Sequence, residues 1–492
     1  MLCLSCKLAL QTVVFPILLS YRPLIHSVVQ DGSALRYPMT HANTSPEKIS
    51  NRWLICLLGI ALQICLGTAY AWSYFQKPLG DAFGWSNSMT AWAFSLAICF
   101  LGISAAWGGT KLASIGPTRL AMAGGVLFGL GYLLAALALS MKSPTLLFIG
   151  YGVIGGCGLG LCYVTPVATV AKWFPDKKGL STGLVIMGFG LGALAMSKLF
   201  APLLYAHFTS GVELVYELVD GKQTLQNPEA LQSILTKLFA ALGVIFLILT
   251  VPIGWFLRNP PKGYVPAGWT PPPSAASAAS IAASSLSARD CILSGRFLLM
   301  WLVFFCNIAA GIAIIGFQSP LFQDLWRTLD ASLDVKTLAA YGATLIAVTS
   351  LFNGIGRFFW GWMSDKMGRS RTFSIMLGSQ ILVFAALANT ASPWIFAVLF
   401  CYILLCYGGG FGTMPSFILD VFGARQMPVV YGMILTAWSA GGIVGPQMVG
   451  LIADNWPKDA GYYSFLASTA FVSIGFVATF FLGNQRFQKK PA

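Results

Sequence analysis

The chain has 492 residues, of which 57% are hydrophobic and 9% charged, and its mean hydropathy is +0.74. Charged residues make up about a quarter of soluble globular domains, so this composition excludes an ordinary soluble protein and indicates a polytopic protein of the lipid bilayer. The formal net charge of +14 raises the possibility of nucleic-acid binding. However, the cations are scattered over short loops beside apolar segments, as membrane topology requires. We therefore expect no nucleic-acid partner.

Residues 1–52 form an N-terminal extension that we expect to be disordered or to follow a mis-assigned start codon. The apolar run at residues 8–20 is only about half as long as a membrane span, and no small-residue cleavage site follows it. The internal Met39 precedes a polar stretch of the kind that leads into a first transmembrane helix.

Apolar runs of about 20 residues follow, each long enough to cross roughly 30 Å of hydrocarbon as a helix. They predict twelve spans, at 53–75, 90–112, 119–140, 145–170, 178–206, 234–257, 296–320, 338–363, 371–390, 393–418, 427–453 and 460–483. Residues 258–295 turn to Pro, Ala and Ser, a composition that cannot bury enough apolar surface to fold. The sequence thus predicts an all-α membrane protein with two six-helix halves, 53–257 and 296–484, a cytoplasmic linker between them and a tail at 485–492.

The basic residues indicate how these spans are oriented. Lys and Arg gather in one set of alternating loops and in both terminal segments, whereas the longest loops of the opposite set carry acidic residues such as Glu213, Glu217, Asp330 and Asp334. Because Lys and Arg accumulate on the cytoplasmic side, both termini are predicted to be cytoplasmic. The membrane that we expect is a bacterial inner membrane.

The two halves carry matching motifs in the same order, which is a known plan for transporters. The pairs are the loops at 109–116 and 361–369, then Gly160 and Pro166 with Gly409 and Pro415, then Gly183 and Gly192 with Gly432 and Gly441. These motifs resemble the major facilitator superfamily, whose hallmark loop reads G-x-x-x-D-[RK]-x-G-[RK]. The match at 361–369 is complete, and the resemblance implies a gating role for its residues Asp365, Lys366, Gly368 and Arg369. In the first half, Ala113 and Ser114 replace the acidic residue and the basic one.

Further stretches resemble the oxalate/formate antiporter family within that superfamily, from about Trp53 to the C-terminus. They lie at 67–73, 172–179, 259–264 and 353–357. The resemblance implies a carrier of small carboxylates that works by alternating access. We expect no enzyme, because no His, Asp or Ser constellation stands at catalytic spacing. We also expect no cofactor, no metal and no obligatory protein partner. The glycine runs at 155–160 and 408–412 indicate close helix packing.

Arg357 is the main candidate for the substrate site. It lies in the apolar run from Leu345 to Trp362, where no acidic residue is placed to neutralise it. Inserting such a charge at mid-bilayer costs roughly 2.5 to 3.5 kcal/mol, and intramembrane cations generally face a cavity and bind an anion. We therefore predict that Arg357 contacts an anionic substrate.

The residue at position 438, a tryptophan, indicates how much charge the substrate carries. In the oxalate exchanger that names the family, an arginine on span 8 and a lysine on span 11 hold the dianion, and Trp438 occupies the lysine position here. A buried charge left unpaired costs several kcal/mol, whereas one carboxylate pairs with one guanidinium. The sequence thus favours a small monocarboxylate such as lactate, pyruvate or formate. The alternatives are an oxalate or dicarboxylate antiporter and a transporter-like sensor of carboxylates.

The remaining candidates are side chains on helices that line the central cavity in this superfamily. They are Asn353, Gln63, Tyr70, Trp72, Tyr163 and Tyr407, with Lys198 as a weaker candidate that could snorkel to the interface. Asn353 stands where related monocarboxylate carriers have an aspartate, one turn before the arginine, and it cannot ionise. Since no Asp or Glu lies in the central part of a predicted span, anion exchange or a proton carried by the substrate is favoured over proton symport through a protein carboxylate.

Overall fold

The structure is a computed structural model that describes residues 51–219, 222–261, 263–269, 287–423 and 426–483. The expectations for residues 1–50, for the tract at 270–286 and for the tail at 485–492 lie outside these ranges. Within the described residues, twelve helical spans are long and apolar enough to cross a membrane. The predicted number of spans is thereby confirmed, and each observed span overlaps its predicted run.

The six spans between Arg52 and Phe256 are called the N-half below. They are built from α4 (Arg52–Gly67), η2 (Thr68–Ala71) and α5 (Trp72–Phe83), α6 (Asn87–Ile115), α7 (Pro117–Ser140), α8 (Pro144–Leu147), η3 (Phe148–Gly155) and α9 (Gly156–Trp173), α10 (Lys178–Ala195), η4 (Met196–Phe200) and α11 (Ala201–Thr209), and α12 (Pro228–Phe256). Before α12, the strands β1 (Tyr216–Val219) and β2 (Lys222–Leu225) form an antiparallel hairpin in which Tyr216 pairs with Leu225.

The six spans between Gly295 and Thr479 are called the C-half. They consist of α15 (Gly295–Ile315), α17 (Val335–Met367), α18 (Arg369–Ala388), α19 (Pro393–Phe422), α20 (Met427–Ile434) with α21 (Thr436–Asn455), and α22 (Ala460–Thr479). Two shorter helices, α14 (Ala288–Ile292) and α16 (Gln318–Leu329), flank α15.

Helix α14 lies in a stretch that the composition predicts to be unstructured. Its N-terminus is fixed by a capping box, in which Ser287 Oγ accepts from Asp290 N and Asp290 Oδ2 accepts from Ser287 N. Cys291 is fully buried, and α14 contacts α20. A local cap and one buried side chain therefore order this end of the predicted linker, which composition alone does not reveal.

Small residues set the spacing of the helices, as the glycine runs predict. A Cβ atom at Gly156 or Gly160 would overlap the backbone of α6, and one at Gly158 would overlap the backbone of α7. In the C-half, a Cβ atom at Gly408 or Gly412 would overlap the backbone of α17. Inside a membrane the hydrophobic effect does not drive helices together, so they associate mainly through close packing at small residues. Here such packing holds α17 against α19.

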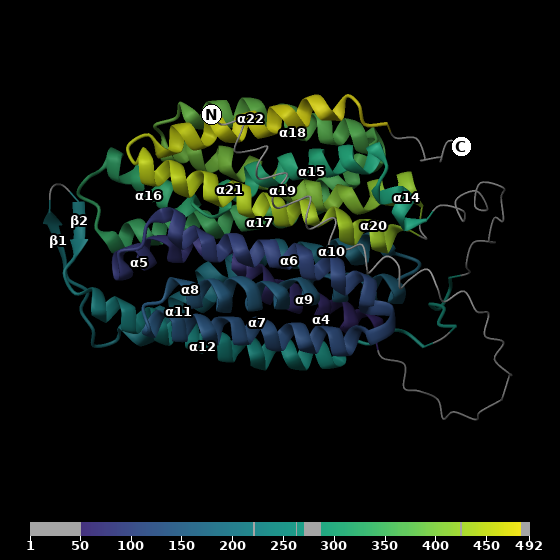
Figure 1. Ribbon diagram of the computed structural model, residues 1–492, viewed down its shortest axis with the longest axis horizontal. Coiled ribbons are helices and arrows are strands. Elements are labelled where there is room, and N and C mark those ends of the chain that lie inside the picture. The colour runs from purple at the N-terminus through teal and green to yellow at the C-terminus, as the bar shows by residue number, and fades with distance from the viewer. Residues whose placement is uncertain (1–50, 220–221, 262, 270–286, 424–425, 484–492) are drawn as a thin grey trace. The chain divides into compact units, whose positions relative to one another are not determined.

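The two halves meet along two helix pairs, α6 with α21 and α10 with α17. Figure 1 shows the N-half in purple to teal and the C-half in green to yellow, with α6, α10, α17 and α21 at the border between them. The other large contacts lie within one half, such as α7 with α12 and α18 with α22. These four helices therefore make most of the contact between the halves.

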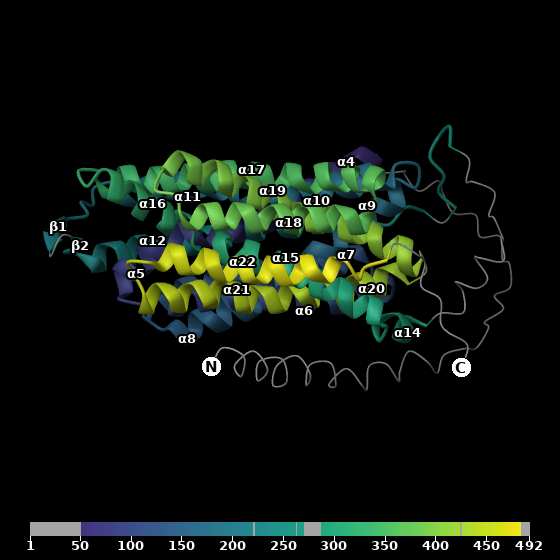
Figure 2. The same ribbon diagram turned by 90° about the horizontal axis from the view of Figure 1, so that it is seen from above.

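The two ends of the bundle differ. One end carries the start of α4, the end of α22 and the helix α14, and we name it the terminal face; the opposite end carries β1, β2 and α16, and we name it the hairpin face (Figures 1 and 2). At the terminal face, α6 and α17 end in matching turns, with φ 88° at Gly116 and φ 87° at Gly368. Positive φ values of this kind favour glycine, so the internal repeat extends to the backbone conformation of these turns.

Candidate functional site

Arg357 is buried between the halves, with 2% of its surface exposed. Its Nη1 donates a 3.2 Å hydrogen bond to the backbone oxygen of Ile186 in α10. Its Cζ lies 4.9 Å from the ring centroid of Phe411 and 5.5 Å from that of Phe189. Both Nε and Nη2 are buried and lack a hydrogen-bond partner among the described residues. The guanidinium thus retains two donors on one edge, which is the geometry that a carboxylate accepts in bidentate fashion.

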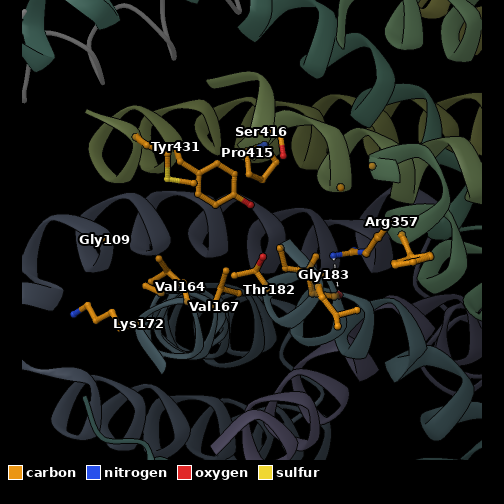
Figure 3. A pocket seen from close by; sticks show the side chains of 18 of the residues that line it. Gly109, Val164, Val167, Lys172, Thr182, Gly183, Arg357, Pro415, Ser416 and Tyr431 are labelled. Carbon is orange, nitrogen blue, oxygen red and sulfur yellow. Dashed lines mark hydrogen bonds between the residues drawn. The ribbon is translucent and has the colours of Figure 1, made fainter. Parts of the chain in front are cut away.

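A cavity of about 590 Å³ leads from Arg357 to the terminal face. Tyr431 and Pro415 line its middle, and Lys172 and Asp365 line its mouth, where the Asp365 side chain is 64% exposed. Figure 3 shows the Lys172 and Arg357 side chains at opposite ends of this cavity. Most of the lining is apolar, with side chains such as Val164 and Val167. A small anion can therefore reach a single deep guanidinium from the terminal face.

An aromatic cluster closes the other side of Arg357. Trp438 lies at its centre, with ring centroids 4.6 Å from Phe411, 5.2 Å from Tyr163 and 5.7 Å from Phe189. Edge-to-face pairs of this kind pack firmly. The indole Nε1 of Trp438 makes no hydrogen bond of good geometry in the described part of the chain. Trp438 thus packs against Phe189 and Phe411, the two rings that contact the Arg357 guanidinium, and it contributes an apolar wall.

Beyond Trp438, the Tyr70 and Tyr407 hydroxyls form a 2.5 Å hydrogen bond that joins the N-half to the C-half. Tyr70 reaches this position because span 1 changes from α4 to the short 3-10 segment η2 at Thr68. Such mid-helix changes of geometry often mark functional sites. Both tyrosines are fully buried. They form the next layer of the barrier between Arg357 and the hairpin face.

The other predicted site residues divide into two groups. Asn353 lies one turn before Arg357 in α17, is buried, and has an Oδ1 atom without a partner among the described residues. Gln63 donates from Nε2 to the backbone oxygen of Tyr163 at 3.0 Å, so it bonds to a neighbouring helix. Trp72 is placed elsewhere: its indole donates to Gln76, and its ring packs 4.8 Å from Tyr151 inside the N-half. The structure therefore places Trp72 outside the lining of the cavity that holds Arg357.

The residues of the loop motif after α17 interact within the C-half. Arg369 bonds to Asp365 at 2.6 Å and to Asp420 at 3.0 Å, and its guanidinium also contacts Ser364. The Lys366 ammonium lies 3.9 Å from the Trp362 ring centroid. Gly368 provides the turn into α18. These contacts tie the ends of α17, α18 and α19 together at the mouth of the cavity.

Replacing both Arg369 and Asp420 tests whether this pair is energetically coupled. We expect Arg369→Gln and Asp420→Asn each to lower the melting temperature, and the double variant to lower it less than the sum. The reason is that each single change already breaks the same ion pair, for which we expect a coupling of about 0.5–1 kcal/mol. Thermal unfolding of the four proteins in one detergent measures it, and strictly additive losses would show that the pair contributes nothing.

The hairpin side of the border is closed by contacts between the halves. Ser350 Oγ in α17 donates to the backbone oxygen of Gly190 at 2.6 Å and accepts from the backbone nitrogen of Leu194. Lys198 donates to Thr344 at 2.7 Å. The Asp454 carboxylate at the end of α21 accepts hydrogen bonds from the backbone nitrogens of Asn87 and Ser88 at the start of α6. A negative charge at a helix N-terminus interacts favourably with the helix dipole. Lys198 therefore belongs to this seal and not to the cavity.

Sequence reasoning missed Tyr431, Phe189 and Phe411 as neighbours of Arg357. Tyr431 precedes Trp438 by seven residues, which is two helical turns, so the two could have been placed on one face of span 11. No comparable signal marks Phe189 and Phe411 among 35 phenylalanines. In the part of the chain that the structure describes, no group of three His, Cys, Asp or Glu side chains is arranged to hold a metal ion.

Twelve spans, two packed halves and a central charged cavity that is open at one face and sealed at the other define a multi-pass membrane transporter. The sequence model described as the Major Facilitator Superfamily matches residues 56–446 and 328–491. The chain belongs to the Major Facilitator Superfamily. The family and the fold thus define a transporter and not an enzyme.

Named relatives agree with this assignment. The chain is 25% identical over 435 residues to the oxalate:formate antiporter of Oxalobacter formigenes, covering 88% of this chain and 92% of that protein. It is 29% identical over 468 residues to the apicoplast pyruvate carrier 1 of Toxoplasma gondii, covering 80% and 82%. Among solved structures, a bacterial homologue of the human lysosomal transporter Spinster superposes with a TM-score of 0.62 at 16% identity, covering 92% and 100%. This last likeness concerns the fold alone.

Proposed function

We propose that this protein carries small monocarboxylates across a membrane by alternating access. The observation that carries the proposal is the buried guanidinium of Arg357 at the inner end of the cavity, whose Nε and Nη2 have no hydrogen-bond partner among the described residues. A monocarboxylate neutralises that charge one to one and takes both donors. The similarity to a protein named as a pyruvate carrier supports this substrate class.

A dicarboxylate is the second candidate, supported by the similarity to a protein named as an oxalate:formate antiporter. It requires a second cation, and the cavity lining offers Lys172. However, Lys172 lies at the far end of the cavity from Arg357 (Figure 3) and its Nζ already donates to Asn259 at 3.0 Å. A small dianion at Arg357 would leave one charge facing the rings of Trp438 and Phe411, which cannot compensate it.

The remaining features fit exchange or passage of a substrate that carries its own proton. The residue one turn before Arg357 is Asn353, which does not titrate. We assign the terminal face to the cytoplasm, because the basic loops lie there, and we propose that the membrane is a bacterial inner membrane. In this assignment, the structure is open to the cytoplasm and closed at the outer face by the Tyr70–Tyr407 pair and the Ser350 and Asp454 contacts.

Flux into proteoliposomes tests the proposal. Purified protein is reconstituted, and uptake of labelled pyruvate, lactate, formate and oxalate is measured with vesicles that are empty or preloaded with unlabelled substrate. We expect pyruvate, lactate or formate uptake well above that of protein-free vesicles, and acceleration by preloading if the carrier exchanges anions. Oxalate uptake without monocarboxylate uptake would overturn the proposal in favour of the second candidate. Binding of monocarboxylates without any flux would instead support a sensor.

A further inference from the structure

Tyr431 lines the middle of the cavity, between its mouth and Arg357. It lies in α20 and lines the cavity, with 6% of its surface exposed. Figure 3 shows its ring inside the cavity, on the side of α20 and opposite Thr182 and Val167. Its hydroxyl is buried and makes no hydrogen bond of good geometry with the described residues. A buried hydroxyl without a partner is destabilising relative to one that is paired, so it is suited to a ligand that supplies an acceptor.

A second hydroxyl lies beside the first. The Tyr163 hydroxyl in α9 is also buried without a partner of good geometry, and it lies close enough to the Tyr431 hydroxyl for the two phenols to interact with each other as well as with the Arg357 guanidinium. Arg357 and Tyr431 therefore line the cavity directly, and the Tyr163 hydroxyl adjoins Tyr431 without being part of the lining. The phenols come from different halves, since α9 belongs to the N-half and α20 to the C-half.

This donor set exceeds what a bare carboxylate needs. A carboxylate that lies against Arg357 Nε and Nη2 uses both of its oxygens in the bidentate pair. An oxygen on the neighbouring carbon would then point away from the guanidinium, toward further donors or acceptors. A phenol can donate to a 2-oxo group and can either donate to or accept from a 2-hydroxy group. An unsubstituted acid of the same size would supply no partner for the Tyr431 hydroxyl.

We infer that Tyr431, together with Tyr163, makes this carrier selective for 2-oxo and 2-hydroxy monocarboxylates over unsubstituted monocarboxylates. The inference rests on the proposed function, because it concerns a substrate already held by Arg357. Sites that are built to hydrogen-bond a substrate oxygen reject the analogue that lacks it far more strongly than apolar pockets reject a missing methylene. If one or two hydrogen bonds to the substrate oxygen are formed, we expect uptake of the substituted acid to exceed that of the unsubstituted acid on the order of 10- to 100-fold.

Pyruvate and propionate provide a matched pair for the test, since they have the same carbon skeleton and charge and differ in the oxygen at carbon 2. Initial uptake of each is measured in proteoliposomes containing the unchanged protein, Tyr431→Phe, Tyr163→Phe or Tyr402→Phe. Tyr402 is the control for the chemical change, because its hydroxyl donates to Ser379 at 2.7 Å outside the cavity. We expect a pyruvate-to-propionate ratio of about 10 or more in the unchanged protein and in Tyr402→Phe.

In Tyr431→Phe, we expect this ratio to fall about tenfold through loss of pyruvate uptake, while propionate uptake is unchanged. Retained propionate uptake shows that the variant is folded and active. A ratio near 1 in the unchanged protein, or a ratio that neither tyrosine variant alters, would overturn the inference and leave the proposed function intact. Failure of the proposed function has a different signature, because then neither acid would be taken up at a rate that depends on Arg357.

Discussion

Arg357→Gln is expected to reduce monocarboxylate flux at least about 100-fold. Glutamine keeps a side-chain amide that can form hydrogen bonds, but it carries no charge. A carboxylate at the inner end of the cavity would then be buried without a counter-ion. Breaking a buried ion pair in this way costs about 3–5 kcal/mol, and each 1.4 kcal/mol is a factor of ten in affinity. Initial uptake of labelled pyruvate into proteoliposomes, compared over a range of concentrations, measures the loss.

The stability of the same variant distinguishes binding from structure. In the described chain, the Arg357 guanidinium donates one hydrogen bond, to Ile186, and no salt bridge is found for it. A buried charge with so few partners destabilises the empty protein, so Arg357→Gln should melt at the same temperature or higher. A marked fall in the melting temperature would mean that Arg357 is structural. Arg357→Lys keeps the charge but lacks the planar guanidinium that can form a bidentate pair. Its flux should lie between that of the unchanged protein and that of Arg357→Gln.

Lys172→Gln is the matched control for charge in the cavity. Lys172 lines the mouth and is exposed, so its contribution to the field at Arg357 is screened by solvent and salt. We expect a modest loss of uptake that disappears at high ionic strength. If Lys172→Gln lowered uptake as much as Arg357→Gln, both cations would act on the same anion. That result would support the hypothesis of a dicarboxylate substrate.

The sequence is sufficient to predict the spans, the family and the central arginine, because each depends on one-dimensional signals. A run of apolar residues specifies a spanning helix, and a lone charge in such a run requires a cavity or a ligand. The placement of Trp438 beside Arg357 follows from the alignment of one motif in span 11. None of these predictions depends on which faces of the helices are in contact.

What the sequence does not predict depends on helix rotation and on changes of helical geometry. Trp72 lies two residues after Tyr70, yet its ring packs inside the N-half while Tyr70 reaches Tyr407 across the border. Residues two apart on a helix point in different directions, and η2 alters the rotation further. The order of α14 and the seal made by Ser350 and Asp454 are likewise set by tertiary contacts, for which a single sequence carries no periodic signal.

Alternating access requires the closed hairpin side to form fully, and at Gly190 helix α10 packs closely against the backbone of α17. A Cβ atom on Gly190 would lie 2.7 Å from the backbone Cα and N of Gly354. Both contacts are backbone atoms, so no flexible side chain can yield, and α10 must separate from α17. Overpacking of this kind costs about 1–3 kcal/mol, so Gly190→Ala is expected to lower transport about tenfold or more.

Gly183→Ala is the matched control, since it adds the same methyl group to the same helix at a cavity-lining position where the added Cβ would meet no atom within 4 Å. We expect it to transport normally. Closure itself is followed by placing a cysteine at Ala347, which is buried on the α17 face that carries Ser350 and Gly354, in a chain whose native cysteines are replaced. A membrane-impermeant thiol reagent applied from the hairpin side should label this cysteine faster in Gly190→Ala than in Gly183→Ala. Equal labelling together with normal transport would show that contact between Gly190 and Gly354 is not needed for closure, and the seal would then have to depend on Asp454 and the α6–α21 pair.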